Sequence, residues 1–196
     1  DFVFYLAGAP AVMTRGESQA WTERHFLWIS GNTTFLRREA LVAMGGYRQK
    51  LEWHADWLVG VVFALRYGIG VVPEVLAGLR TKEGSYSSAG ISTFKRASEV
   101  IVATFDTIKA PKFNDIWDLV NRYPCIISPL GERNLVIGLG SKVRFWPLLY
   151  RYIFWRISYN ARLQGKSFIG FIVPHLFFVP KRIAKLAINQ LIVMQR

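Results

Sequence analysis

The first 90 residues alternate between short apolar runs and stretches with helical spacing. Apolar runs bounded by turn residues predict strands, here at residues 2–6, 26–29, 33–36, 71–72 and 74–79. Apolar spacing closed by glycine predicts a short helix from Arg38 to Met44 and a longer one from Asp56 to Tyr67. Residues 9–25 are interpreted as a mixed polar connection. Strands that alternate with helices indicate an α/β layer.

The pattern changes near residue 91, after a turn-rich stretch from Gly84 to Gly90. From there on helical spacing dominates, with helices predicted over residues 92–109, 114–122, 144–163 and 181–194. We therefore divide the chain into residues 1–92 and a mainly α-helical C-terminal region, residues 93–196. The chain begins at Asp1 next to an apolar run, which we interpret as a piece cut from a longer protein.

The composition predicts a folded protein with a basic C-terminal half. Hydrophobic residues make up 52% of the chain, which excludes a disordered segment. Residues 1–100 hold 11 basic and 9 acidic side chains, whereas residues 101–196 hold 14 and 4. Because no acid follows Glu132, this part attracts anionic partners such as lipid head groups, nucleic acid or phosphorylated substrates. The best candidate for a membrane span, Phe168 to Val179, has 12 residues and is too short and broken to cross a bilayer.

The stretch from Phe145 to Tyr159 contains seven aromatic residues. On a helix, Arg144, Arg151 and Arg162 would lie within about 20° of one another, among apolar and aromatic faces. Such a helix suits a membrane interface, with aromatic rings at head-group depth and arginines on anionic lipid. The alternative is that the aromatic residues pack the tail against the rest of the protein. Nucleic-acid binding is disfavoured because no nucleic-acid motif is present.

Four short motifs between residues 31 and 88 carry a family resemblance. They are Gly31–Leu41 with the Gly45-Gly46-Tyr47 turn, Leu51–Leu58, Tyr67–Arg80, and Tyr86-Ser87. In this order they resemble the acceptor-side part of a family 2 glycosyltransferase catalytic domain. The resemblance implies a partial glycosyltransferase A-type layer, similar to nucleotide-diphospho-sugar transferases, followed by the helical region.

The same resemblance implies the activity and the base. It implies an inverting glycosyltransferase that transfers a sugar from a nucleotide-sugar donor to a saccharide or lipid-linked acceptor, in cell-surface glycan synthesis. Asp56 would be the catalytic base that takes the proton of the acceptor hydroxyl. Many members have Glu immediately before this aspartate, and here the position is Ala55. The alternative interpretation of Asp56 is an acid that favours a helix N-terminus.

Five further residues are candidates for substrate binding: Gly31, Asn32, Trp53, His54 and Arg80. The Gly31-Asn32 turn would line the donor side, where glycine permits close backbone approach. Trp53 could stack on a sugar ring and His54 could hydrogen-bond hydroxyls or phosphate. Arg80 could bind the donor diphosphate or an acidic acceptor. The alternatives are a core tryptophan, an exposed histidine and a solvated arginine.

The sequence contains no Asp-x-Asp and no other metal motif. In the family, Mn²⁺ or Mg²⁺ is bound by an N-terminal half, so a metal is expected for the intact enzyme only. We therefore expect this chain alone to be inactive. The expected location is cytoplasmic, peripheral at the inner face of the membrane. The alternative function is a non-catalytic module, derived from the same fold, that docks to a membrane or a partner.

Overall fold

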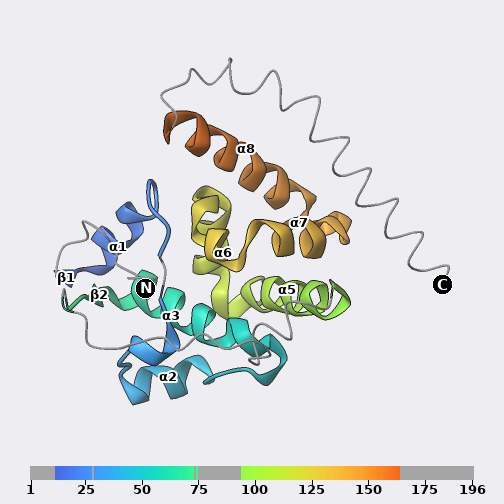
Figure 1. Ribbon diagram of the computed structural model, residues 1–196. Coiled ribbons are helices and arrows are strands. Elements are labelled where there is room, and N and C mark those ends of the chain that lie inside the picture. The colour runs from blue at the N-terminus through green and yellow to red at the C-terminus, as the bar shows by residue number, and fades with distance from the viewer. Residues whose placement is uncertain (1–11, 28, 73, 75–93, 164–196) are drawn as a thin grey trace. The chain divides into compact units, whose positions relative to one another are not determined.

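The computed structural model describes residues 12–27, 29–72, 74 and 94–163 (Figure 1). Helices account for 76% of these residues, and their strands form one two-stranded sheet. The chain divides into two compact units, Asp1–Leu149 and Tyr150–Arg196. The boundary that the sequence predicts between residues 92 and 93 lies outside the described residues, so it stays a prediction.

The first described segments contain two short strands, three α-helices and two 3-10 helices. In chain order they are β1 (Val12–Met13), α1 (Arg15–Trp21), η1 (Gly31–Thr33), α2 (Arg38–Met44), η2 (Gln49–His54), α3 (Ala55–Tyr67) and β2 (Ile69–Gly70). The strands pair antiparallel, with Val12 opposite Gly70 and Met13 opposite Ile69. Gly68 closes α3 with φ of 87°, and a Cβ there would lie 2.3 Å from the Met13 carbonyl oxygen. Glycine is therefore required where the chain turns from α3 into β2.

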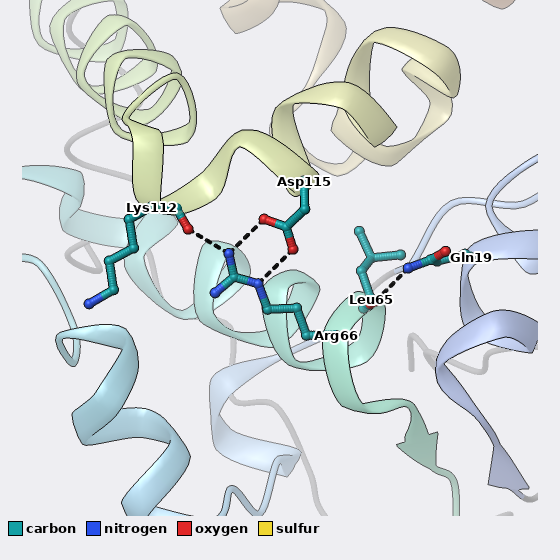
Figure 2. Close-up of polar contacts among 5 residues, drawn as sticks. All are labelled: Gln19, Leu65, Arg66, Lys112 and Asp115. Carbon is teal, nitrogen blue, oxygen red and sulfur yellow. Dashed lines mark hydrogen bonds and ion pairs between the residues drawn. The ribbon is translucent and has the colours of Figure 1, made fainter.

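Helix α3 forms the core of the first unit. All nine residues from Trp57 to Leu65 are buried, so the helix is enclosed on every face. This explains its nearly continuous apolar sequence, because a helix that is hydrophobic all round is a buried one. Helix α1 packs against it, and Gln19 Nε2 donates a hydrogen bond of 2.9 Å to the Leu65 carbonyl oxygen (Figure 2).

The segment from residue 94 to residue 163 is helical along almost its whole length. Its elements are α5 (Phe94–Ile108), η3 (Pro111–Phe113), α6 (Asn114–Arg122), η4 (Pro124–Leu130), α7 (Glu132–Gly140), η5 (Val143–Phe145) and α8 (Trp146–Leu163). Helices α5 and α7 pack side by side (Figure 1). Their closest approach is at Gly138, where a Cβ would lie 2.3 Å from Ile101 Cγ2 and 2.6 Å from Ile101 Cβ.

A bidentate ion pair joins α3 to α6. The Arg66 guanidinium donates to both carboxylate oxygens of Asp115, at 2.8 and 2.6 Å, and to the Lys112 carbonyl oxygen at 2.6 Å (Figure 2). These hydrogen bonds hold the pKa of Asp115 below its ordinary value. Nearby, the Cys125 thiol donates to the Thr22 carbonyl oxygen, and the Tyr123 hydroxyl donates to Glu23 at 2.9 Å. Residues 12–72 and 94–149 therefore pack together as parts of one unit.

The predicted α/β layer is wrong, because the described residues are mostly helical. The described residues of the apolar run, 26, 27 and 29, and the stretch 33–36 contain no strand, and the second strand lies at Ile69–Gly70 rather than at 71–72. Short apolar runs do not distinguish a strand from buried irregular chain. Residues 9–25 hold β1 and α1 instead of a mere connection. The strand predicted at 2–6 lies outside the described residues, as does the strand predicted at 74–79 except for Glu74, which is not in a strand.

Helix α8 begins at Trp146, so Arg144 precedes it instead of lying on it. The Arg144 guanidinium bonds both carboxylate oxygens of Asp106 on α5 at 2.7 Å. The expected stripe of Arg144, Arg151 and Arg162 on one helix is therefore not formed. None of the helices within the described ranges is long and apolar enough to cross a membrane.

Candidate functional site

The candidate base, Asp56, lies in the first turn of α3. Its carboxylate is half-buried. Oδ1 accepts a hydrogen bond of 2.7 Å from the Trp57 backbone N–H, and Oδ2 accepts one of 3.3 Å from the Gly31 backbone N–H. Each carboxylate oxygen has two lone pairs, so each can accept one further hydrogen bond. The carboxylate is thus oriented by the backbone and still able to receive a proton from a substrate hydroxyl.

The segment from Ile29 to Gly31 lies along one face of α3. A Cβ on Gly31 would lie 2.9 Å from both Cβ and Oδ2 of Asp56, and a Cβ on Gly60 would lie 2.6 Å from Ile29 Cγ2. Positions 56 and 60 are about 6 Å apart along a helix axis, which matches the length of two extended residues. The segment therefore runs antiparallel to α3 and contacts it at both points. Two residues that the sequence predicts for the site, Gly31 and Asp56, are in direct contact.

Trp53 and His54 immediately precede α3 at the end of η2. Their rings meet edge to face, with centroids 5.8 Å apart. His54 is 7% exposed, so it is buried where the alternative interpretation expected an exposed side chain. Burial lowers the pKa of His54 to about 4, and its Nε2 has no hydrogen-bond partner. At neutral pH the imidazole is uncharged and brings no positive charge toward a phosphate.

The buried imidazole predicts a specific dependence of stability on pH. Its pKa is lower in the folded state than the 6.5 of a free histidine, so between pH 6.5 and about 4 the unfolded state binds more protons. The free energy of unfolding should therefore fall, by up to about 1.4 kcal/mol for each pH unit, as the pH drops through this window. Urea unfolding of wild type and His54→Leu at several pH values tests this. The variant should show a shallower fall, and equal slopes would contradict the prediction.

The backbone is strained at Glu52, four residues before Asp56. Glu52 has φ of 45° and ψ of −121°, and among the described residues it is the one non-glycine with positive φ. These angles suit the first central residue of a type II′ turn, where glycine is normal, and cost an L-residue about 1–3 kcal/mol. Leu51 and His54 are buried on either side of the strained residue. Strain of this kind persists when the surrounding structure fixes it and is concentrated at functional sites.

Arg96 on α5 binds the side chain of this strained residue. Its Nε donates to Oε2 of Glu52 at 2.9 Å and to Oε1 at 3.2 Å. The Arg96 side chain is 50% exposed and that of Glu52 is 22% exposed. An exposed pair of this kind contributes about 0–1 kcal/mol. Alone it does not offset the strain, so the buried neighbours must hold the turn together with it.

The remaining predicted residues are not brought to the carboxylate by any described contact. Asn32 is exposed in η1, where its Oδ1 accepts a hydrogen bond from the Ser30 hydroxyl. Arg80 lies outside the described residues. Across residues 12–27, 29–72, 74 and 94–163, no three His, Cys, Asp or Glu side chains are grouped so that they could hold a metal ion. These residues do not fit Mn²⁺ or Mg²⁺, and we derive no metal-assisted step from them.

Sequence reasoning missed three residues at this site: Glu52, Trp57 and Arg96. Trp57 is buried next to Asp56, and its indole Nε1 has no hydrogen-bond partner. Its sequence signal was available, because it lies beside the candidate base in an aromatic motif. Arg96 had no such signal, because it is distant in sequence and lies beyond the last motif.

Comparison with family models, with curated proteins and with solved structures finds no match to this chain.

Proposed function

We propose that this chain is the acceptor-side part of an inverting glycosyltransferase in which Asp56 is the catalytic base. The observation that supports this is the Asp56 carboxylate, held half-buried in the first turn of α3 by the Gly31 and Trp57 N–H groups. Two of the motifs that resemble family 2 glycosyltransferases meet there. The substrates would be a nucleotide-sugar donor and a saccharide or lipid-linked acceptor, in cell-surface glycan synthesis.

The proposed reaction is a single displacement at the anomeric carbon. The acceptor hydroxyl donates a hydrogen bond to the free lone pair of an Asp56 oxygen. Its oxygen attacks the anomeric carbon from the face opposite the nucleoside diphosphate, and the bond to the diphosphate oxygen breaks with its electron pair. Asp56 takes the hydroxyl proton as the new glycosidic bond forms. Mn²⁺ or Mg²⁺, if required, would be bound by other residues of the intact enzyme.

The test is transfer by the intact enzyme of which we propose this chain is a part. Purified protein is incubated with common nucleotide sugars, with oligosaccharide and lipid-linked acceptors, and with Mn²⁺ or Mg²⁺. The expected product carries the anomeric configuration opposite to that of the donor, which proton NMR of the product reads directly. A product with retained configuration, or no transfer from any donor by folded protein, would overturn the proposal. The 196-residue chain alone should show no turnover.

Exposed aromatic residues on α8 favour a second role, docking to a membrane. Tyr150 and Phe154 are exposed, and their spacing of four residues places them on one face of the helix. Aromatic rings of this kind insert at head-group depth, and the net charge of +12 complements anionic lipid. We infer that the protein acts in the cytoplasm, peripherally at the inner face of the membrane. Docking without catalysis is the alternative function.

Vesicle co-sedimentation tests the docking role. Binding to anionic vesicles should fall with salt because exposed charges are screened over about 8–10 Å at physiological ionic strength. It should not fall to zero, since burial of aromatic area is largely insensitive to salt. Changing Tyr150 and Phe154 to serine should remove the salt-resistant part, while changing Arg151 and Arg162 to glutamine should reduce the salt-sensitive part. Equal binding to neutral and anionic vesicles, or none, would contradict the role.

A further inference from the structure

The connection between α5 and the candidate site has a feature that the proposed function does not use. Arg96, near the start of α5, binds the carboxylate of Glu52, whose backbone is the strained point of η2. We propose that Arg96 is a positioning residue for the candidate site: by fixing Glu52 it holds η2 in its strained conformation and so sets where Asp56 lies. This inference rests on the proposed function for its catalytic meaning, but its structural claim can be tested without activity.

The backbone carries the effect from Glu52 to Asp56. The Ala55 N–H donates to the Glu52 carbonyl oxygen, so the orientation of the strained residue determines how α3 begins. The body of α3 cannot adjust, because every residue from Trp57 to Leu65 is buried. Its first turn is less constrained, since Ala55 and Asp56 are only half-buried. A change at Glu52 should therefore appear at Asp56 and at its contact with Gly31.

General stabilisation does not explain why the pair is placed at this residue. The same helix carries a second ion pair near its other end, between Asp106 and Arg144. The arginine is similarly exposed in the two pairs, 52% against 50%, while Asp106 is more exposed than Glu52, 41% against 22%. That pair joins α5 to η5 and touches no residue of the candidate site. The two pairs are chemically alike, and only one of them is attached to strained backbone. Arg144→Gln is therefore a matched control for Arg96→Gln.

The contact between Gly31 and Asp56 provides a direct reporter. In ¹⁵N-labelled 196-residue chain, the Gly31 amide resonance reports its hydrogen bond to Asp56 Oδ2. The spectrum of Asp56→Asn shows where the Gly31 amide resonance lies when its contact with residue 56 is changed. Arg96→Gln should move the Gly31 resonance from its wild-type position, whereas Arg144→Gln should leave it there. Exchanging the charges, Glu52→Arg with Arg96→Glu, should return the resonance toward wild type.

A second variant separates positioning from simple stability. Glu52→Gly permits positive φ without strain, so it should unfold at a higher temperature than Glu52→Ala. It also removes the carboxylate that Arg96 binds, so the Gly31 resonance should still be displaced. If the pair mattered only for stability, the Gly31 resonance of the more stable variant, Glu52→Gly, would lie closer to its wild-type position than that of Glu52→Ala. A Gly31 resonance unchanged in both Arg96→Gln and Glu52→Gly would overturn the proposal.

Activity distinguishes this proposal from the proposed function. In the proposed intact enzyme, Arg96→Gln should lower kcat for transfer on the order of 10-fold with less change in KM, because a misplaced base lowers the rate. The charge exchange should recover part of that loss. If wild type transfers no sugar but Gly31 responds as expected, the glycosyltransferase proposal fails and the positioning role stands. If wild type transfers sugar and neither Gly31 nor kcat responds to Arg96→Gln, the positioning role fails alone.

Discussion

Replacing Asp56 with asparagine should lower the rate of sugar transfer by the proposed intact enzyme by about 10²–10⁴-fold, the usual contribution of a general base. Asparagine has nearly the same shape, but its single amide oxygen can accept from only one of the two backbone N–H groups that Asp56 binds, that of Gly31 or that of Trp57. It does not take up the proton of the acceptor hydroxyl. Initial rates with saturating donor and acceptor measure the effect on kcat.

Asp115→Asn is the matched control for this substitution. It makes the same chemical change at an aspartate whose carboxylate binds Arg66 in the structural pair between α3 and α6. This variant should lose some stability and keep most of its transfer rate. Asp56→Asn should behave in the opposite way, since an acid in the first turn of a helix contributes only about 0.3–1 kcal/mol. Transfer by Asp56→Asn within a few-fold of wild type would exclude Asp56 as the base.

Replacing Gly138 with alanine should destabilise the fold more than any other conservative change that we consider. The new Cβ would lie 2.3 Å from Ile101 Cγ2 and 2.6 Å from Ile101 Cβ, so α5 and α7 would have to separate. Ile101 is fully buried in the core. Overpacking of a core costs about 1–3 kcal/mol and occasionally more, and we expect the upper end here. Urea unfolding at neutral pH measures the loss.

Gly140→Ala on the same helix is its control. A Cβ at Gly140 would meet Leu149 Cδ2 at 3.8 Å, which is ordinary van der Waals contact. Alanine is favoured over glycine in a helix by about 1 kcal/mol, so this variant should be as stable as wild type or more so. Equal stability of the two alanine variants would show that α5 and α7 are not in close contact at Gly138.

Helices were predictable where the sequence marks their ends. Glycines follow α2 and α3 directly, and both adopt positive φ, 95° at Gly45 and 87° at Gly68. Helix α1 was missed although its start signal is present. Thr14 and Glu17 form a capping box, in which Oε2 of Glu17 accepts from the Thr14 N–H at 2.8 Å. Helix α1 is mostly polar and has no apolar residues at helical spacing, so the capping box was the signal in the sequence that could have predicted it.

The α/β prediction failed because apolar runs of about four residues were interpreted as strands. In the run at residues 26–29, Leu27 is fully buried and Phe26 is 38% exposed. An irregular segment that buries single side chains produces the same apolar run as a strand does. So short a run does not show whether the segment pairs with another strand. The Ile29 end of this run instead packs against Gly60 of α3.

The candidate site was predictable as far as its residues lie within motifs. Gly31 and Asp56 were singled out from separate motifs, and the structure places them in contact. The burial of His54 was not foreseen, since a histidine with acidic residues two positions away on either side, Glu52 and Asp56, is equally compatible with an exposed side chain. The pair of Glu52 with Arg96 was beyond reach for a different reason. A positive φ cannot be predicted from the sequence when the residue is not glycine. Contacts between residues far apart in the sequence have no local sequence signal either.

The complete enclosure of α3 has a consequence during synthesis on the ribosome. Its apolar residues emerge by Leu65. Helix α1 and the Ile29–Gly31 segment, which pack against it, emerge earlier, whereas Asp115, which binds Arg66, and Cys125, which binds Thr22 of the same unit, emerge later. At about 5–20 residues per second, some 60 further residues take about 3–12 s to be added. During this interval the faces of the helix that α1 and the Ile29–Gly31 segment do not cover stay exposed. The nascent chain should therefore be a strong substrate for chaperones that bind at the ribosomal exit, and this requirement should end once α6 and η4 have emerged.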